Sequence, residues 1–146
     1  KLLFKCGKVL ADKAPASFGA LMGAAFMKGG MALKGKTTAD LADIAGAVQT
    51  ALDALMDRGG AKLGDKTMLD AMHPAIQAMR AQSADAAVGA FFEAAAQAAQ
   101  RGAEETQHMQ SQIGRASWQG ERSAGKMDPG ARAIAMMLAA AARHTV

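Results

Sequence analysis

The sequence predicts an all-α protein, folded as an antiparallel helical bundle or barrel. Of its 146 residues 51% are hydrophobic, but 4% are aromatic and none is tyrosine, so alanine and methionine supply the apolar surface. Strands favour β-branched and aromatic residues, and no alternating run of these residues occurs. Apolar residues instead recur at three- and four-residue steps, as on the buried face of a helix. The length suits one domain over residues 1–146.

The first two helices are expected at residues 2–12 and from residue 17 onward. The first helix places its leucines and its single valine on one face. Pro15 disfavours helix in the residue before it, and Ser17 is a natural N-cap for the next helix. We expect that second helix to end near Gly29-Gly30.

The third helix follows Thr37-Thr38-Ala39-Asp40, an N-terminal capping signature, and ends at Gly59-Gly60. A fourth helix is expected from Thr67, its N-cap, with a bend at Pro74 because proline lacks an amide donor. The third helix has the clearest apolar face: Leu41, Ile44, Val48, Leu52 and Leu55.

The last two helices are expected from Ser83 or Asp85 to about residues 109–113, and from Gly130 to Arg143. The final helix has a clear start, because Asp128 accepts bonds from its free amides and Pro129 fits the first helical position. Six helical segments, most of them joined by short connections, indicate an antiparallel bundle.

Residues 114–130 form the longest connection, with glycines at positions 114, 120, 125 and 130 and the single tryptophan of the chain. Long loops in helical proteins are often functional. In an up-and-down bundle this connection would share one end with those at residues 14–19 and 59–68. With Lys66, Arg115 and Arg122 on that end, helix N-termini would hold an anion. A plain cap and loop remains the alternative.

Other chemistry finds little support in the sequence. The net charge is +4 without a basic stripe, which argues against a nucleic-acid partner. Cys6 is the only cysteine, which excludes an internal disulfide and suits the cytoplasm. No apolar run reaches membrane-spanning length, so no membrane association is expected. The segment at residues 59–67 is not a P-loop, because Asp65 precedes the lysine and a helix precedes the segment.

We predict no catalytic and no metal-binding residue within the chain. The three histidines lack the spacing of a metal site, and no serine has a histidine placed as its base. Methionines in helical stretches are expected to pack in the core rather than to contact a cofactor: Met22, Met56, Met72 and Met136.

Three segments resemble the DhaL family, the nucleotide-binding subunit of dihydroxyacetone kinase. They are Ala14-Pro15-Ala16-Ser17-Phe18-Gly19, Gly64-Asp65-Lys66-Thr67-Met68-Leu69-Asp70-Ala71 and residues 114–130, the last of which has Gly-Arg-Ala-Ser-Trp and Asp-Pro-Gly at its two ends. The resemblance spans nearly the whole chain in order and spacing. It implies a barrel of eight antiparallel helices, about six of them present here, with ADP or ATP bound at one end.

The resemblance also implies seven nucleotide-binding residues. Ser17 and Phe18 match contacts to the phosphates, and Gly59 and Met68 match residues that line the pocket. Arg115 matches a phosphate- or nucleotide-contacting arginine. Asp128 and Gly130 match a loop that closes over the nucleotide.

The chain departs from the family at the metal site. The family holds two Mg²⁺ ions with three aspartates of a Gly-Asp-x-Asp-His-Gly motif near its N-terminus, and this motif is missing here. We expect these ligands upstream of Lys1, so that the chain lacks its N-terminal metal-binding segment and is inactive alone.

The resemblance implies Mg²⁺-dependent phosphoryl transfer to dihydroxyacetone held on a partner subunit or domain. The nucleotide would be exchangeable ATP, or a permanently held ADP that a phosphohistidine phosphotransfer protein rephosphorylates before each transfer. The alternative function is a non-catalytic helical module that docks on a partner such as a transcription regulator.

Overall fold

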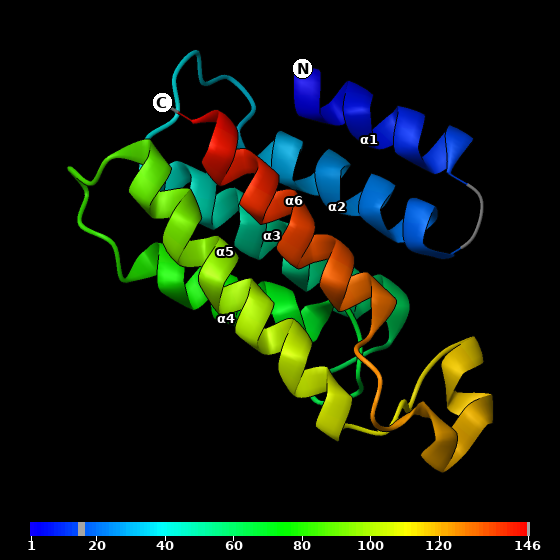
Figure 1. Cartoon of the computed structure of the whole chain (residues 1–146). Helices are drawn as coiled ribbons and strands as arrows, with labels where there is room; N and C mark the ends of the chain where they lie inside the picture. Colours follow the sequence, from blue (N-terminus) through cyan, green and yellow to red (C-terminus); the bar gives the residue numbers. More distant parts are fainter. Residues whose placement is uncertain (15–16, 146) are drawn as a thin grey trace. The chain divides into compact units, whose positions relative to one another are not determined.

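The computed structural model describes residues 1–14 and 17–145, except for the side chain of Arg115, and these residues are helical without any strand (Figure 1). The predicted all-α class is confirmed. The elements are α1 Leu2–Lys13, α2 Ser17–Ala32, α3 Leu41–Gly59, α4 Leu69–Arg80, α5 Val88–Glu105, the 3₁₀ segments η1 Thr106–His108 and η2 Arg115–Ser123, and α6 Pro129–His144.

Internal contacts divide the chain into two compact units, Lys1–Gly60 and Ala61–Val146. In the first unit α2 packs against both α1 and α3. Helices α1 and α2 approach closely because glycines face each other. A Cβ atom built on Gly7 would lie 2.6 Å from the carbonyl oxygen of Gly23.

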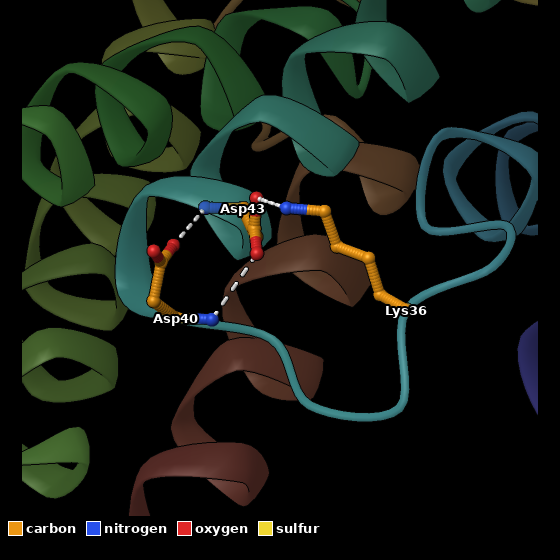
Figure 2. Close-up of polar contacts among 3 residues, drawn as sticks. All are labelled: Lys36, Asp40 and Asp43. Atoms are coloured by element: carbon orange, nitrogen blue, oxygen red, sulfur yellow. Dashed lines mark hydrogen bonds and ion pairs between the residues drawn. The ribbon is translucent and has the colours of Figure 1, made fainter.

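Helix α3 begins with a reciprocal cap, which confirms the capping signature predicted before it. The Asp43 amide donates to Asp40 Oδ1 at 2.7 Å, and the Asp40 amide donates to Asp43 Oδ2 at 3.3 Å. Lys36 also pairs with Asp43, which ties the preceding loop to the helix start (Figure 2). At the other end Gly60 has φ 63°, the left-handed conformation of a helix C-cap.

In the second unit α5 packs against both α4 and α6. Gly102 marks its closest approach to α4, because a Cβ atom there would lie 2.3 Å from the Asp70 carbonyl oxygen. Large apolar side chains fill the core between runs of buried alanine: Leu69, Ile76, Met79 and Phe91. Small residues thus let the helices approach, while a few large ones fill the space left between them.

Three sequence expectations need correction in this unit. Helix α5 begins at Val88, because the two expected caps, Ser83 and Asp85, bond each other in a turn before it. It ends at Glu105 and tightens into η1. Residues 114–130 are less irregular than expected, since they contain the 3₁₀ segment η2, broken at Gly120.

The methionine expectation is confirmed for two residues and wrong for a third. Met22 and Met72 are buried, but Met136 is 61% exposed on α6. None of the described helices combines the length and the hydropathy that a membrane crossing requires.

Candidate functional site

The start of α6 has the predicted cap. Asp128 Oδ2 accepts from the Ala131 amide at 2.7 Å, and Pro129 occupies the first helical turn. The Asp128 amide in turn donates to Thr106 Oγ1 at 2.8 Å. Because Thr106 is fully buried in η1, this bond ties the start of α6 to the end of α5.

The Asp128 carboxyl lies in a partly buried, charged environment. Burial raises its pKa above the usual 3.8, and the amides of Ala131 and Gly130 partly offset that effect. Among charged neighbours Asp70 raises the pKa further and Lys66 lowers it. The carboxylates of Asp128 and Asp70 and the ammonium group of Lys66 therefore interact electrostatically near the start of α6.

The segment before α4 is folded by two buried aspartates. Asp70 accepts from the Gly64 amide at 2.6 Å and from the Thr67 amide at 2.8 Å. Asp65 accepts from the Lys62 amide at 2.9 Å. The predicted cap Thr67 plays a smaller part, because its hydroxyl accepts from the Leu69 amide at 3.2 Å and the helix begins at Leu69.

Lys66 is buried, with 5% of its surface exposed. Its Nζ donates to the carbonyl oxygens of Met109 at 3.2 Å and Lys126 at 2.6 Å, and to that of Ser123. The expectation that Lys66 would present its charge to an anion is therefore wrong. The ammonium group is directed at the backbone of the long connection before α6.

The connection at residues 109–126 is fixed by hydrogen bonds near its ends, while its middle part, the tip, is exposed. Ser123 Oγ accepts from the Ser111 amide at 3.0 Å and donates to the Gly120 carbonyl at 2.7 Å. The Gly125 amide donates to the Gln107 carbonyl at 2.8 Å. At the tip, Trp118 is 86% exposed. The Ser111–Ser123 and Gln107–Gly125 bonds were not predicted, because no local pattern identifies partners that are distant in sequence.

The structure brings three of the seven predicted site residues together. A Cβ atom on Gly130 would lie 3.4 Å from Met68 Cβ and 3.0 Å from Asp128 Oδ2. Met68 is buried directly before α4. These three residues form a contiguous wall at the start of α6.

The remaining four site residues belong to the first unit or to η2. Ser17 and Phe18 are exposed in the first turn of α2, and Gly59 is the last residue of α3, all within the first unit. The backbone of Arg115 starts η2, and its side chain lies outside the described residues. The common end for all three connections joins residues of both units and stays a prediction.

No three metal-binding side chains converge within residues 1–14 and 17–145. Asp65 and Asp70 are occupied by backbone amides, as described above. The sequence did not identify the side chains that hold the backbone of this site in place. They are Lys66, whose ammonium group donates to main-chain carbonyls, and Asp70, Thr106 and Ser123, which accept from main-chain amides.

Comparison with known proteins gives matches over nearly the whole chain. The DAK2 domain family matches residues 1–143. The ADP-binding subunit DhaL of a PEP-dependent dihydroxyacetone kinase of Listeria innocua is 35% identical over 137 residues, which are 94% of this chain and 63% of that subunit. Its Escherichia coli counterpart is 33% identical, over 94% of this chain and 66% of that subunit.

Longer kinases contain a similar segment. An L-erythrulose 1-kinase of Mycolicibacterium smegmatis is 37% identical over 97% of this chain and 25% of its own length. The crystal structure of the dihydroxyacetone kinase of C. freundii superposes with a TM-score of 0.72 and 32% identity, over 97% of this chain and 23% of that one. The same enzyme in complex with AMP-PNP and Mg²⁺ gives a TM-score of 0.70.

Proposed function

Because the chain belongs to the DAK2 domain family, we propose that it is the nucleotide-binding part of a kinase and carries ADP or ATP. The observation that carries this proposal is its 35% identity, over 94% of the chain, to a subunit named for ADP binding. The chain spans 63% of that subunit, so the complete reaction is also a proposal. In that reaction a phosphoryl group passes to dihydroxyacetone, or to a related ketose, held on a partner subunit.

The wall of Met68, Asp128 and Gly130 suits the sugar and base of a nucleotide better than its phosphates. The Asp128 carboxylate already accepts from the first free amides of α6, so a phosphate would meet a negative charge there. A carboxylate oxygen accepts readily from a ribose hydroxyl or a base amine. Met68 is buried, so we assign it the role of supporting this wall from the protein side.

We assign the phosphates to the remaining predicted residues. Arg115 would neutralise phosphate charge, since a guanidinium matches phosphate geometry with two parallel bonds. The backbone beside it is open, because a Cβ atom built on Gly114 meets no atom within 4 Å. In the first unit, Ser17 and Phe18 at the start of α2 remain the predicted phosphate contacts, and Gly59 at the end of α3 remains a predicted lining residue of the nucleotide pocket.

No three candidate metal ligands converge among the described residues, so nothing there supports a magnesium site made by protein side chains alone. We therefore assign no magnesium step to this chain and propose that the Mg²⁺ ligands lie outside its 146 residues. Mg²⁺ neutralises the charge that develops in phosphoryl transfer, so the chain alone would bind nucleotide without turnover. Turnover near that of an intact kinase, with the dihydroxyacetone-binding subunit and Mg²⁺ added, would contradict this.

The donor distinguishes two versions of the proposal. In one, ATP exchanges in each cycle, and in the other a retained ADP is rephosphorylated by a phosphohistidine protein. Relatives named as PEP-dependent favour the second. Native mass spectrometry of purified protein would reveal ADP that survives gel filtration.

Arg115→Ala tests the site directly. Loss of a charge-assisted bond should weaken ADP binding by roughly 1.5–3 kcal/mol, measured by isothermal titration calorimetry. Arg80→Ala is the control, because Arg80 is exposed at the end of α4, in the same unit. Equal affinities for ADP in the two variants would remove Arg115 from the site.

One observation favours the alternative of a docking module. Trp118 is 86% exposed, and tryptophan is enriched at the centre of protein interfaces. Protein that is free of nucleotide, fails to bind ADP and yet binds a regulator would support this alternative over the kinase proposal.

A further inference from the structure

We propose that Lys66 is a positioning residue that holds the connection at residues 109–126 in its nucleotide-binding arrangement. Its effect on the loop is independent of any ligand, while its effect on affinity rests on the proposed function. Nothing in the resemblance assigned Lys66 to the site.

The three carbonyl acceptors of Lys66 are spread along the whole connection. Met109 follows η1, Ser123 ends η2, and Lys126 lies shortly before α6. An ammonium group has three donors, and Lys66 Nζ has three acceptors. One side chain therefore fastens the beginning, the later part and the end of the connection to a single point.

Lys66 is itself held in place from both sides. Asp70 accepts from the amides of Gly64 and Thr67, and Asp65 Oδ2 accepts from the Lys62 amide at 2.9 Å. A loose lysine would merely follow the connection. Because its backbone is fixed to the start of α4, Lys66 can impose a position on the connection.

The backbone of Lys66 supports this role. Its φ of 62° is the only positive value among the non-glycine residues that the structure describes. Side chains other than glycine adopt this conformation at a cost, and the surroundings must maintain it. Glycine would relieve that cost but would lack the ammonium group, so a lysine here indicates that the side chain is used.

The fastened connection contains or adjoins most of the second unit's proposed ligand contacts. Arg115 lies within it, and Asp128 and Gly130 follow directly after Lys126. When a binding-competent arrangement is populated only part of the time, the apparent Kd rises by the inverse of that fraction. Loss of the Lys66 bonds should therefore weaken nucleotide binding without removing any direct contact.

The rate of cleavage by trypsin reports whether the connection is held in place in the absence of nucleotide. It cleaves after Lys126, whose carbonyl accepts from Lys66 Nζ at 2.6 Å. Lys66→Met keeps the apolar stem and removes all three donors. Cleavage by a protease follows the population of the open form, so we expect the Lys126–Met127 bond to be cut about tenfold faster or more.

Two controls separate this effect from general destabilisation. Lys62→Met changes an exposed lysine of the same segment and should leave cleavage at Lys126 unchanged. Cleavage after the exposed Lys34 in the first unit serves as an internal standard within each sample. Equal acceleration at Lys34 and Lys126 in Lys66→Met would overturn a local positioning role.

A chemical rescue keeps the test decisive if Lys66→Met folds poorly. In a Cys6→Ser background, Lys66→Cys can be alkylated with bromoethylamine while unfolded, which restores a lysine-like ammonium group. After refolding, we expect the alkylated protein to regain protection at Lys126 and the unalkylated one to remain sensitive. Equal cleavage of the two forms would overturn the proposal.

Isothermal titration calorimetry with ADP then tests whether the position of the connection affects nucleotide affinity. We expect Lys66→Met to raise the Kd for ADP about tenfold, with recovery in the alkylated protein. Weaker binding with unchanged protection would make Lys66 a direct ligand and overturn the proposal. If the parent chain binds no ADP, the proposed function fails, and the protease result alone decides whether Lys66 holds the connection.

Discussion

At the scale of single residues, the buried polar groups of the second unit bind backbone. Asp70, Thr106 and Ser123 each bond a main-chain amide, and Lys66 bonds three main-chain carbonyls. Buried polar groups require partners, and long connections leave many main-chain groups without helical ones. These side chains therefore provide the hydrogen-bond partners that main-chain groups in the connections lack and that main-chain groups in helices find within the helix.

Local chemistry made some of these residues predictable. Asp128 and Pro129 were identified because a cap bonds an amide three residues away. The sequence pattern indicates Lys66 as an anion ligand, and this prediction is wrong. The carbonyl acceptors of Lys66 lie 43 to 60 residues away in the sequence. A pattern of neighbouring residues carries no information about partners at that distance.

Asp128 gives a pH-dependent prediction at this scale. Because its pKa in the folded protein is raised above 3.8, the folded state holds this proton more tightly than the unfolded chain does. Ionisation of Asp128 therefore lowers stability, a cost that is absent below the unfolded pKa and complete above the folded one. Asp128→Asn keeps an effective cap and cannot ionise. We expect its stability relative to wild type to increase from pH 3.5 to 7.

Urea unfolding of both proteins across this pH range measures the difference. Asp128→Ala is the control for the cap itself, which should cost about 1 kcal/mol at neutral pH. A free-energy difference between Asp128→Asn and wild type that falls with rising pH would contradict the raised pKa. Lys66 and Asp70, the charged neighbours, are unchanged in all three proteins.

At the scale of elements, helix ends with adjacent caps were predictable and those determined by distant contacts were not. Helices α3 and α6 begin directly after the expected N-caps, Asp40 and Asp128. Helix α5 begins at Val88, later than the local signals indicated, because Ser83 and Asp85 satisfy each other first. It also ends early, where Thr106 bonds the start of α6.

Two helical glycines provide a matched pair of predictions. A Cβ atom on Gly102 would lie 2.3 Å from the Asp70 carbonyl oxygen and 2.8 Å from Pro74 Cγ, while one on Gly46 meets no atom within 4 Å. Gly102→Ala should force α5 from α4 and destabilise the protein by about 1–3 kcal/mol. Gly46→Ala should stabilise it by up to about 1 kcal/mol, because alanine is the better helix former.

Urea midpoints of the two variants and of wild type test this pair. The same chemical change is made in both, so the sign of each shift reports the space beside the glycine. Equal shifts in both variants would show that helix propensity outweighs the close approach of α4 and α5.

At the scale of the whole molecule, the all-α class followed from composition. Few aromatic and β-branched residues and many alanines leave helices as the only way to bury apolar surface. The shared end of the three connections was derived from a count of helices, and a count does not fix their placement. That inference, like the assignment of Ser17, Phe18 and Gly59, therefore stays a prediction.

We expect the 146 residues to unfold as one domain. A segment of about 60 residues buries a smaller share of its surface than a longer chain does and is marginally stable, so we do not expect Lys1–Gly60 to persist alone. Differential scanning calorimetry should give one transition whose calorimetric and van't Hoff enthalpies agree. Two resolved transitions would instead assign a separate domain to each compact unit.

Trp118 is the sole indole of a protein without tyrosine, and it projects into solvent. Excitation at long ultraviolet wavelengths therefore addresses one known position, and the emission spectrum needs no deconvolution. The unliganded molecule should emit with the red-shifted maximum of an indole in water. A docked protein or an ordered nucleotide at the tip would shift the emission maximum of Trp118 or quench its fluorescence. The intrinsic fluorescence of the chain therefore reports whether the tip is occupied.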